Sequence, residues 1–273
     1  MITLKHGLYT AVVLPELGMN TFSLDLGKGE ILRKAPSVDV LKKDTNIYGI
    51  PMILPPGRIP SGKFSFEGRD YQMGINDMED NTMIHGFLSR SAFTIDELTE
   101  NSVRAHYENL GQILPFWFMM RVRFWLDDEG YHQHVEIENT GKINMPLAFG
   151  FHSCFKEPEY EKLPLCASMN RGKEVPIDDH GKMLRAGGKL NDEIDDSYKI
   201  DGHVAVIGDY DYVLSDTFEY MTVWNFDAKS SFVAFEPQQG VANCFNNGGG
   251  LKVLAPGEVK TYETLLRWHD ASK

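Results

Sequence analysis

Residues 116–138, FWFMMRVRFWLDDEGYHQHVEIE, decide the fold class of this chain. Within 116–126 polar and apolar side chains alternate, so that Arg121 and Arg123 point to one side of an extended chain and Val122, between them, points to the other. Alternation with a period of two is typical of a strand that has one face in water and one face in a core. The pattern therefore predicts a half-buried antiparallel β-strand.

The second half of the same stretch repeats the pattern. From Tyr131 to Glu138 histidines and glutamates share one face, and Val135 and Ile137 lie on the other. The acidic, glycine-containing run 127–130 between the two segments is typical of a turn. Two alternating segments joined by a short turn predict a β-hairpin.

Short runs of the same kind occur along the whole chain. Further strands are predicted at 8–14, 21–26, 63–66, 92–98, 103–109, 147–155, 210–214, 222–226 and 232–236. No stretch longer than about two turns has a helical period. Many short strands separated by Gly, Asp and Asn turns favour an all-β fold, a large antiparallel β-sandwich. Because the sequence has no repeat and no linker, we expect residues 1–273 to form a single domain.

Composition and charge exclude several classes of function. Of the 273 residues, 39 are acidic and 27 are basic, which gives a net charge of −12. Nucleic acid and anionic lipid are bound by basic patches, so we expect this chain to bind neither. The longest apolar stretch, 113–126, is interrupted by two arginines and falls short of the roughly 20 residues that span a bilayer.

The cysteines indicate where the protein resides. Cys154, Cys166 and Cys244 are odd in number and widely spaced, without a C-x-x-C pair. A disulfide framework or a zinc–thiolate site is therefore not expected. The N-terminus has no signal-peptide pattern, and together these features predict a cytoplasmic protein.

His152 is the first candidate for chemistry. If 148–155 is a strand, its phenylalanines point one way, and Ala148, Gly150, His152 and Cys154 point the other. The small neighbours leave room for a ligand beside the imidazole, which can exchange a proton near neutral pH. A hydrogen-bonded core histidine is the alternative.

Glu236 is the second candidate. It shares a strand face with Phe232 and Ala234, where a carboxylate is costly unless it is paired or functional. Because Pro237 cannot donate to a ladder, we expect the strand to end there and to place Glu236 at the edge of a cleft. Partial burial would raise the pKa of Glu236 towards the range of a general base. A solvated carboxylate at a sheet edge is the alternative.

Arg58 and His85 are candidates for ligand binding. Arg58 follows the stiff turn 55–57, and His85 precedes Gly86. Rigidly held polar side chains suit the hydroxyl groups of a sugar, although both residues also fit structural roles in turns. Three tryptophans are candidates for stacking on a sugar, with core packing as the alternative: Trp117, Trp125 and Trp224.

Nine short motifs occur in a characteristic order. They are 48–51 (YGIP), 54–59 (LPPGRI), 62–68 (GKFSFEG), 84–87 (IHGF), 114–116 (LPF), 138–141 (ENTG), 150–152 (GFH), 235–237 (FEP) and 254–258 (LAPGE). In order and spacing they resemble the galactose mutarotase-like, or aldose 1-epimerase, family. The resemblance covers most of the chain.

The resemblance implies a function and a set of roles. It implies a large antiparallel sandwich with an open cleft, and an enzyme that interconverts the α and β anomers of a free aldohexose. His152 would be the general acid that protonates the ring oxygen. Glu236 would be the base that takes the proton of the anomeric hydroxyl.

The resemblance also implies substrate-binding residues. Arg58 and His85 match a substrate-holding pair of the family, and a family aspartate upstream of the catalytic glutamate is best matched by Asp195, with Asp196 as the alternative. We expect His152 and Glu236 to face each other across a space the size of a sugar ring, with Arg58 and His85 on one wall.

The implied reaction sets expectations for cofactors and partners. Ring opening delivers one proton and removes another at adjacent oxygens, so no metal and no cofactor are expected. The expected partner is a small-molecule sugar. We expect the chain to be a monomer or a homodimer.

The chain departs from the family pattern in two places. Ser153 and Cys154 follow the histidine where Pro-Tyr is common, and Gln238 stands where an aromatic is common. Both departures touch the expected cleft, so they bear on the identity of the sugar more than on the fold.

The sequence is also compatible with four other functions. A hexose-6-phosphate 1-epimerase would need extra cations, for which Arg90, Lys63 and Arg69 are available. A non-catalytic carbohydrate-binding or sensor protein would share the fold. A metalloenzyme of the cupin type could use the set His132, His134 and Glu138. A glycoside hydrolase would need a second carboxylate across the cleft from Glu236.

Overall fold

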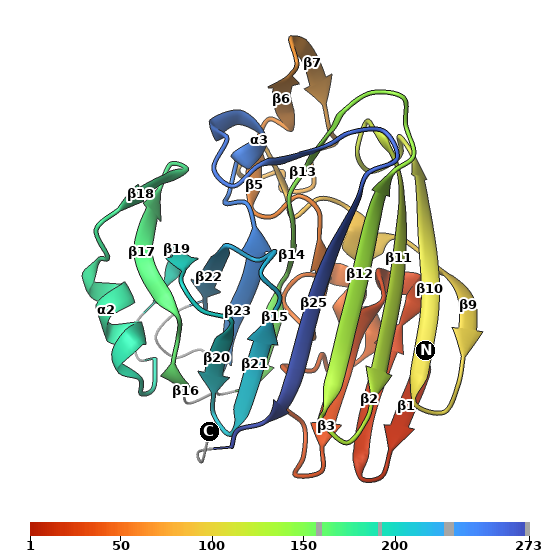
Figure 1. The fold of residues 1–273 in the computed structure, drawn as a ribbon, viewed down its shortest axis with the longest axis vertical. Coiled ribbons are helices and arrows are strands. Elements are labelled where there is room, and N and C mark those ends of the chain that lie inside the picture. The colour runs from red at the N-terminus through yellow and green to blue at the C-terminus, as the bar shows by residue number, and fades with distance from the viewer. Residues whose placement is uncertain (157–159, 191–192, 227–231, 271–273) are drawn as a thin grey trace.

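The computed structural model describes residues 1–156, 160–190, 193–226 and 232–270. It is built mainly of antiparallel strands, and short helices lie in the connections (Figure 1). The predicted all-β sandwich is confirmed. None of the helices that the structure describes is long and apolar enough to cross a membrane.

One layer is a sheet of eight strands that contains the predicted hairpin. Its order is β16 (Tyr160–Lys162), β20 (Val204–Ile207), β21 (Tyr210–Leu214), β25 (Val259–Trp268), β12 (Tyr131–Asn139), β11 (Trp117–Leu126), β10 (Ser102–Leu110) and β9 (Thr94–Leu98). In the hairpin β11–β12, Val122 lies opposite Val135, and both are buried. Arg121 and Arg123 point outwards, as the alternation predicted.

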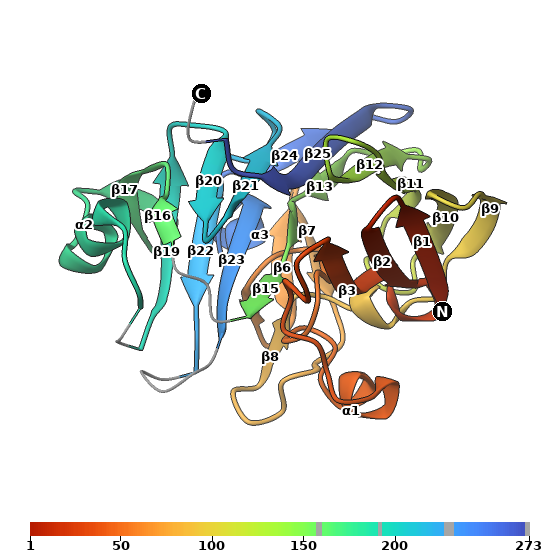
Figure 2. The ribbon, with the colours of Figure 1, turned by 90° about the horizontal axis from the view of Figure 1, so that it is seen from below.

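The second layer combines two sheets. The larger has the order β18 (Lys173–Val175), β17 (Leu165–Asn170), β19 (Asp195–Ile200), β22 (Tyr220–Trp224), β23 (Phe232–Gln239), β14 (Phe149–Phe151) and β4 (Met52–Ile53), and β15 (Ser153–Lys156) also pairs with β23. The smaller consists of β1 (Ile2–His6), β2 (Tyr9–Leu14) and β3 (Asn20–Leu26). In Figure 2, β1–β3 lie below the strands β10–β12, and β1 and β2 contact β11.

Small elements connect the layers. Three two-stranded ribbons are formed by β5 (Arg58–Pro60) with β8 (Thr82–Ile84), β6 (Lys63–Phe66) with β7 (Arg69–Gln72), and β13 (Met145–Leu147) with β24 (Lys252–Leu254). The helical segments are η1 (Pro15–Leu17), α1 (Val38–Lys43), η2 (Leu88–Arg90), α2 (Asp179–Ala186) and α3 (Cys244–Asn247). The sequence pattern did not predict α2. It is short, and the Asp178 carboxylate caps its start by accepting from the Gly181 N–H at 2.7 Å.

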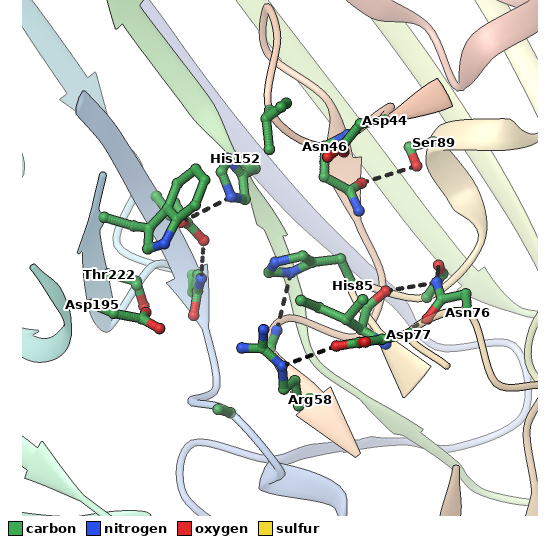
Figure 3. Close-up of a pocket in the computed structure, with 18 of the residues that line it drawn as sticks. Asp44, Asn46, Arg58, Asn76, Asp77, His85, Ser89, His152, Asp195 and Thr222 are labelled. Atoms are coloured by element: carbon green, nitrogen blue, oxygen red, sulfur yellow. Dashed lines mark hydrogen bonds and ion pairs between the residues drawn. The ribbon is translucent and has the colours of Figure 1, made fainter. Parts of the chain in front are cut away.

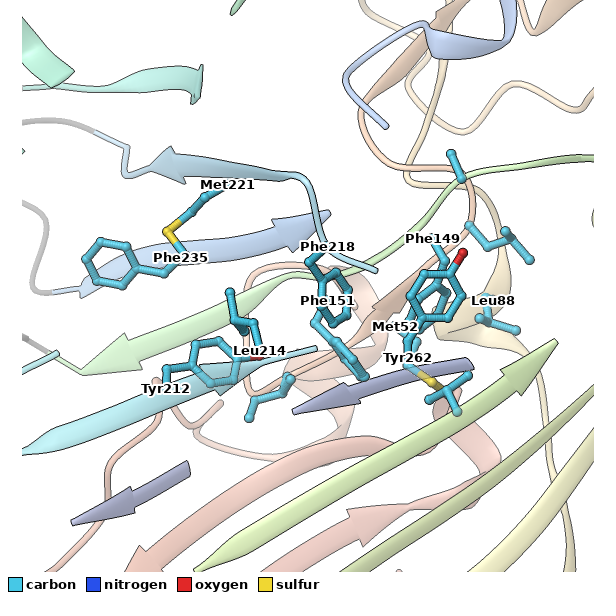
Figure 4. Close-up of a cluster of buried hydrophobic side chains, with 14 of the residues drawn as sticks. Met52, Leu88, Phe149, Phe151, Tyr212, Leu214, Phe218, Met221, Phe235 and Tyr262 are labelled. Atoms are coloured by element: carbon cyan, nitrogen blue, oxygen red, sulfur yellow. The ribbon is translucent and has the colours of Figure 1, made fainter. Parts of the chain in front are cut away.

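Large aromatic side chains fill the space between the layers (Figure 4). The ring of Phe149 lies 5.2 Å from that of Phe151 and 4.7 Å from that of Tyr262 of β25, between ring centroids. The Tyr262 hydroxyl donates to Gln239 Oε1 at 2.7 Å, which satisfies its polar end inside the core. The core therefore joins the strand that carries Phe149 to the opposite sheet.

Strand β23 has one face in this core and one face turned away from it. Val233 and Phe235 pack into the core, whereas Phe232 and Ala234 pack on the other face. Glu236 continues that second face, as the alternation predicted.

The segment 148–155 alternates in the same way, with one exception. Phe151 and Phe155 enter the core, and Cys154 lies on the opposite face together with Ala234. Ala148 was predicted on the face of His152, but it packs in the core. The reason is that the chain leaves the strand conformation at Ala148, between β13 and β14, which resets the alternation.

The prediction that the strand ends at Pro237 is wrong, because β23 continues to Gln239. On one side Pro237 lies opposite Met221 of β22. On its other side it lies between Gln238, which pairs with β14, and Phe235, which pairs with β15, and no bridge to either strand is formed at Pro237 itself. A proline is tolerated there because the ladder is already interrupted. Glu236 therefore lies inside a strand and not at its end.

The aromatic core supports a prediction about stability. Replacing the fully buried Phe149 by alanine (Phe149→Ala) removes its packing against Phe151 and Tyr262 and is expected to lower the free energy of unfolding by about 3–5 kcal/mol. Urea unfolding followed by circular dichroism measures the change. Leu8, which is 81% exposed, is the matched position, and Leu8→Ala is expected to change the free energy by less than about 0.5 kcal/mol. Equal effects of the two substitutions would contradict this assignment of the core.

Candidate active site

A cavity of about 530 Å³ lies on the face of β23 that is turned away from the core (Figure 3). Strands β19, β22 and β23 and the residue His152 form one side of it. Segments that follow α1, flank β5 and surround β8 form the other side. A site between a sheet and loops combines rigid strand side chains with adjustable loop side chains.

Polar side chains cross the floor of the cavity in a row. Ser197 of β19 lies opposite Thr222 of β22, and their hydroxyl oxygens are 2.7 Å apart. Thr222 in turn lies opposite Glu236 of β23. Gly150 of β14 lies opposite Gln238, and Ser153 of β15 lies opposite Phe235, so both strands pair with β23 in the same register. This register places His152, between β14 and β15, opposite Glu236.

His152 and Glu236 are in direct contact. Nε2 of His152 lies 3.1 Å from Oε1 of Glu236, and the two residues are 3% and 2% exposed. The expectation of a gap as wide as a sugar ring between them is wrong. Side chains directly opposite each other on neighbouring strands have Cβ atoms only about 4.5–5.5 Å apart, so an imidazole and a carboxyl group there must touch.

Burial determines how this pair holds its protons. Burial raises the pKa of Glu236 well above its usual value, and the nearby charge of Asp195 adds to the rise. Burial lowers the pKa of His152 to about 4, and the positive charge of Arg33 adds to the lowering. Both shifts favour the neutral forms of the two groups, and a neutral imidazole and a neutral carboxyl group in contact share one proton along the line from Nε2 to Oε1.

His85 lies beside this pair with its hydrogen bonding already set. Its ring is edge-on to that of His152, with 5.1 Å between ring centroids. Nδ1 of His85 accepts from the Gly57 N–H at 3.2 Å, and the backbone N–H of His85 donates back to the Gly57 carbonyl at 2.9 Å. Burial lowers the pKa of His85 well below its usual value, so the ring is neutral and Nε2 carries the proton. Nε2 is therefore a donor.

His85 is held in an unusual backbone conformation, with φ at 56°. The side chain of Asn76 supports this segment: its Nδ2 donates to the carbonyls of Ile84 at 2.8 Å and Gly86 at 2.9 Å, and its Oδ1 accepts from the Ile84 N–H at 2.7 Å. A non-glycine residue with positive φ costs of order 1–3 kcal/mol and points to a functional constraint.

Arg58 and Asp195 complete the candidate residues. The Arg58 guanidinium faces Asp77 and Asp80, with Nε 3.4 Å and 3.7 Å from their carboxylate oxygens. Asp195 lines the cavity on the side opposite to Arg58 and His85 (Figure 3). Asp196, the alternative from the sequence, bonds instead to His180, with Oδ2 2.9 Å from Nδ1. The structure thus brings His152, Glu236, Arg58, His85 and Asp195 around one cavity, while their roles stay predictions.

Of the three tryptophans, only Trp224 lines this cavity. Its ring is 5.6 Å from that of His152 between centroids. Trp117 is half exposed on the outer face of the first sheet, and Trp125 stacks on His132 there, with centroids 4.4 Å apart.

The set His132, His134 and Glu138, predicted as the alternative metal site, does not converge. The three side chains lie on the outer face of β12, away from the cavity. His132 bonds to Asp127 at 2.9 Å, His134 to Glu263 at 2.8 Å, and Glu138 to Arg121 at 2.8 Å. Each is occupied by a different partner, so this set does not form a site.

Within the described part of the chain, the group whose ligand atoms do converge is His85, His152 and Glu236, with all three atoms within 4.8 Å of one another. Two histidines and a carboxylate are a common metal-binding set. Here, however, one nitrogen of His85 accepts the Gly57 amide hydrogen and the other carries a proton, so neither offers a lone pair to an ion. The donor set suits proton exchange better than metal binding.

Sequence reasoning did not identify the cavity residues Ser197, Thr222 and Gln238 as site residues. Ser197 and Thr222 come from strands that the register alone brings beside Glu236, so no local signal marks them. Gln238 was noted only as a departure from a family pattern, and the structure shows its Nε2 donating to Glu236 Oε2 at 2.8 Å. Its position two residues after Glu236, on the same strand face, is the signal that could have found it.

Comparison with known proteins shows which family the chain belongs to. The sequence profile of the aldose 1-epimerase family matches residues 1–267. This chain belongs to the aldose 1-epimerase family.

The individual proteins that the chain resembles are distant relatives. The chain is 29% identical over 99 residues to the uncharacterized protein YihR of Escherichia coli, a match that covers 36% of this chain and only 32% of YihR. It is 24% identical over 203 residues to the protein LacX of Lactococcus lactis, covering 62% of this chain and 67% of LacX.

Solved structures of the family share the fold. A galactose mutarotase-like protein of Clostridium acetobutylicum superposes with a TM-score of 0.88 at 22% identity, covering 98% of this chain and 94% of that one. Galactose 1-epimerase of Lactobacillus acidophilus superposes with a TM-score of 0.72 at 16% identity, covering 98% and 93%.

The tight packing of Gly86, which follows His85, leads to a prediction about stability. A Cβ at Gly86 would lie 1.9 Å from the Leu54 carbonyl oxygen, and φ of Gly86 is +67°. Gly86→Ala is therefore expected to lower the free energy of unfolding by more than the roughly 1–2 kcal/mol that the left-handed conformation alone costs. Gly68 has a similar φ of +75° and open space around it, so Gly68→Ala is the matched control in the same urea titration. Equal losses would show that the contact with Leu54 does not matter.

Proposed function

We propose that this protein is an aldose 1-epimerase that interconverts the α and β anomers of an uncharged free aldohexose. The observation that carries the proposal is the buried contact of 3.1 Å between His152 Nε2 and Glu236 Oε1 on the floor of the cavity. The two oxygens that exchange protons in mutarotation, the ring oxygen and the anomeric hydroxyl, are bonded to the same carbon. An acid and a base that touch each other can therefore reach both oxygens at once.

The reaction follows from how the pair holds its proton. With the shared proton on Nε2, His152 is an acid and Glu236 is a carboxylate base. Glu236 takes the proton of the anomeric hydroxyl, His152 protonates the ring oxygen, the bond from the anomeric carbon to the ring oxygen breaks, and a carbonyl forms. The pair ends neutral, which is the arrangement that burial favours. Rotation about the bond to the neighbouring carbon and reversal of the steps give the other anomer.

The walls of the cavity hold the sugar in this proposal. His85 donates from Nε2 to a sugar oxygen, because its Nδ1 is already an acceptor for Gly57. Arg58 donates and Asp195 accepts hydrogen bonds from opposite sides of the cavity. Trp224 offers an apolar ring surface for the sugar to stack on.

The charges on the cavity wall favour a neutral sugar over a sugar phosphate. Lys63 and Arg69, considered for phosphate binding, lie on the β6–β7 hairpin and do not line the cavity. Arg90 does line it, but its guanidinium donates to the carbonyls of Lys42 and Lys43 at 3.0 Å and 3.4 Å. Among the described residues that line the cavity, the three cations Lys43, Arg58 and Arg90 are balanced by three carboxylates, Asp44, Asp77 and Asp195, which leaves no excess of positive charge for a phosphate.

A purely sugar-binding role explains the pair less well. Burying a histidine and a glutamate in contact costs free energy that hydrogen bonding to a sugar does not require.

We also propose that residues 1–273 act as a single domain, in the cytoplasm, as a monomer or homodimer, and with no metal or cofactor.

The first prediction of this proposal concerns the base. Purified protein is expected to accelerate the change in optical rotation of freshly dissolved α-glucose or α-galactose. Glu236→Gln removes the proton acceptor but keeps the shape, and it is expected to lower kcat by about 10²–10⁴-fold. Polarimetry measures both rates.

Glu263 provides the matched control. Its side chain is 59% exposed on β25, outside the cavity, so Glu263→Gln is expected to keep the full rate. If the wild-type protein accelerates neither sugar but accelerates glucose 6-phosphate, the neutral-sugar proposal is wrong. If none of the three is accelerated, the enzymatic proposal is wrong.

The second prediction concerns pH. Activity requires that the pair share one proton. When His152 binds a second proton, Glu236 is protonated as well and cannot act as a base, so activity is lost. The ionisable neighbours of His152 are Glu236, His85, Cys154 and Arg33. Because the pKa of His152 is lowered to about 4, kcat/KM is expected to persist well below pH 6.5. A profile of kcat/KM measured by polarimetry tests this. An acid limb near the ordinary imidazole value of about 6.5 would contradict the assignment.

A further inference from the structure

Each member of the acid–base pair has a polar neighbour two residues further along its own strand face. Cys154 follows His152, and its Sγ lies 3.4 Å from His152 Nδ1. Gln238 follows Glu236, and its Nε2 donates to Glu236 Oε2 at 2.8 Å. All four side chains are buried. They form one chain of contacts in the order thiol, imidazole, carboxyl, amide.

We propose that Cys154 and Gln238 are positioning residues that confine the shared proton to a single edge of the pair, between His152 Nε2 and Glu236 Oε1. This inference rests on the proposed function and adds to it the residues that decide which nitrogen and which oxygen exchange the proton.

The imidazole end works as follows. A neutral imidazole has one N–H and one lone pair, and the proton exchanges at Nε2 only if Nδ1 keeps its own hydrogen. Cys154 gives that hydrogen an acceptor, since Nδ1–H donates to Sγ. The thiol hydrogen has acceptors of its own in the backbone carbonyls of His152 at 3.6 Å and Asn46 at 3.8 Å. Burial and the charge of Glu236 raise the pKa of Cys154 well above its usual value, so the sulfur remains a neutral thiol.

A thiol in this place has a chemical consequence. A carboxylate accepting from Nδ1 would stabilise the imidazolium and weaken it as an acid. Sulfur is a weak, neutral acceptor, so it fixes the tautomer without that stabilisation. His152 is thereby oriented and yet remains a strong proton donor towards a ring oxygen.

At the carboxyl end, Gln238 determines which oxygen of Glu236 carries the proton. The Gln238 amide donates to Oε2, and a proton on Oε2 would weaken that oxygen as an acceptor, whereas a proton on Oε1 faces the Nε2 lone pair of His152. The acidic proton of Glu236 is therefore restricted to Oε1, the oxygen that contacts His152.

The strands leave room for both neighbours. Gly150 lies opposite Gln238, and a Cβ at Gly150 would approach Gln238 Cγ to 3.0 Å. Ala234 lies opposite Cys154. Small residues at these two cross-strand positions give the amide and the thiol the space to turn towards the pair.

The test of Cys154 uses ¹⁵N-labelled protein and long-range ¹H–¹⁵N NMR, with the His152 signals assigned by their absence in His152→Gln. The wild-type protein is expected to show the tautomer protonated at Nδ1. Cys154→Ser keeps an acceptor and is expected to keep this tautomer, whereas Cys154→Ala is expected to shift it towards Nε2–H. Cys244→Ala, which shortens another buried thiol outside the cavity, is the control and is expected to leave the spectrum of His152 unchanged.

The test of Gln238 uses infrared spectroscopy. The carbonyl stretch of the protonated Glu236 carboxyl is assigned by its loss in Glu236→Gln. Gln238→Met removes the donor to Oε2 at similar volume, and the band is expected to move to higher frequency. Gln239→Met, which changes the next buried glutamine on the opposite strand face, is expected to leave the band in place.

Kinetics connect these measurements to the reaction. Cys154→Ala is expected to lower kcat by about ten- to a hundredfold, the range typical of partners that orient a functional imidazole, with little change in KM, and Cys154→Ser is expected to restore most of the rate. A wild-type His152 protonated at Nε2 with Nδ1 bare, or an unmoved carboxyl band in Gln238→Met, would overturn the inference. Both spectra are recorded without substrate, so they decide the inference even if no sugar is turned over and the proposed function fails.

Discussion

The register between β23 and the strands β14 and β15 is the constraint on which the site depends. It places Glu236 opposite His152 on one face, and on the other face it leaves Phe235 and Phe151 in the core. A slip by one residue would exchange the two faces of β23, burying the carboxylate among aromatic rings and exposing Phe235. The hydrophobic cost of that exchange keeps His152 and Glu236 in contact. Stability and chemistry are thus set by the same pairing of strands.

The rest of the site follows from this pairing through burial. The pair sits on the cavity floor, on a sheet whose back is covered by aromatic side chains, so His152 and Glu236 are only 3% and 2% exposed, and this burial favours their neutral forms. In a low-dielectric setting a single shared proton is the least costly way to hold an imidazole and a carboxyl group 3.1 Å apart. The same burial that is costly to stability gives each group the altered proton affinity that acid–base chemistry needs.

The two sides of the cavity have different origins. The floor is made of strand residues from the large sheet, among them Thr222 and Glu236, fixed by cross-strand pairing. The opposite wall is made of loop residues, of which His85 is held by backbone hydrogen bonds to Gly57 and by the Asn76 side chain. In the proposed function the strand residues exchange the protons and the loop residues contact the sugar, so the identity of the sugar is to be sought in the loops around Arg58 and His85.

The sequence by itself determined the all-β class, the hairpin 116–138, the two faces of the segments around His152 and Glu236, and the motifs of the aldose 1-epimerase family. These depend on local alternation and on short motifs, which a single chain displays directly. The tertiary structure alone decided that His152 touches Glu236, that Ser197 and Thr222 join them, that Asp195 and not Asp196 faces the cavity, and that β23 runs on through Pro237. Each of these depends on the register between strands that are far apart in the sequence. Such a register is fixed by which side chains the whole core can bury at once, and no local pattern contains that information.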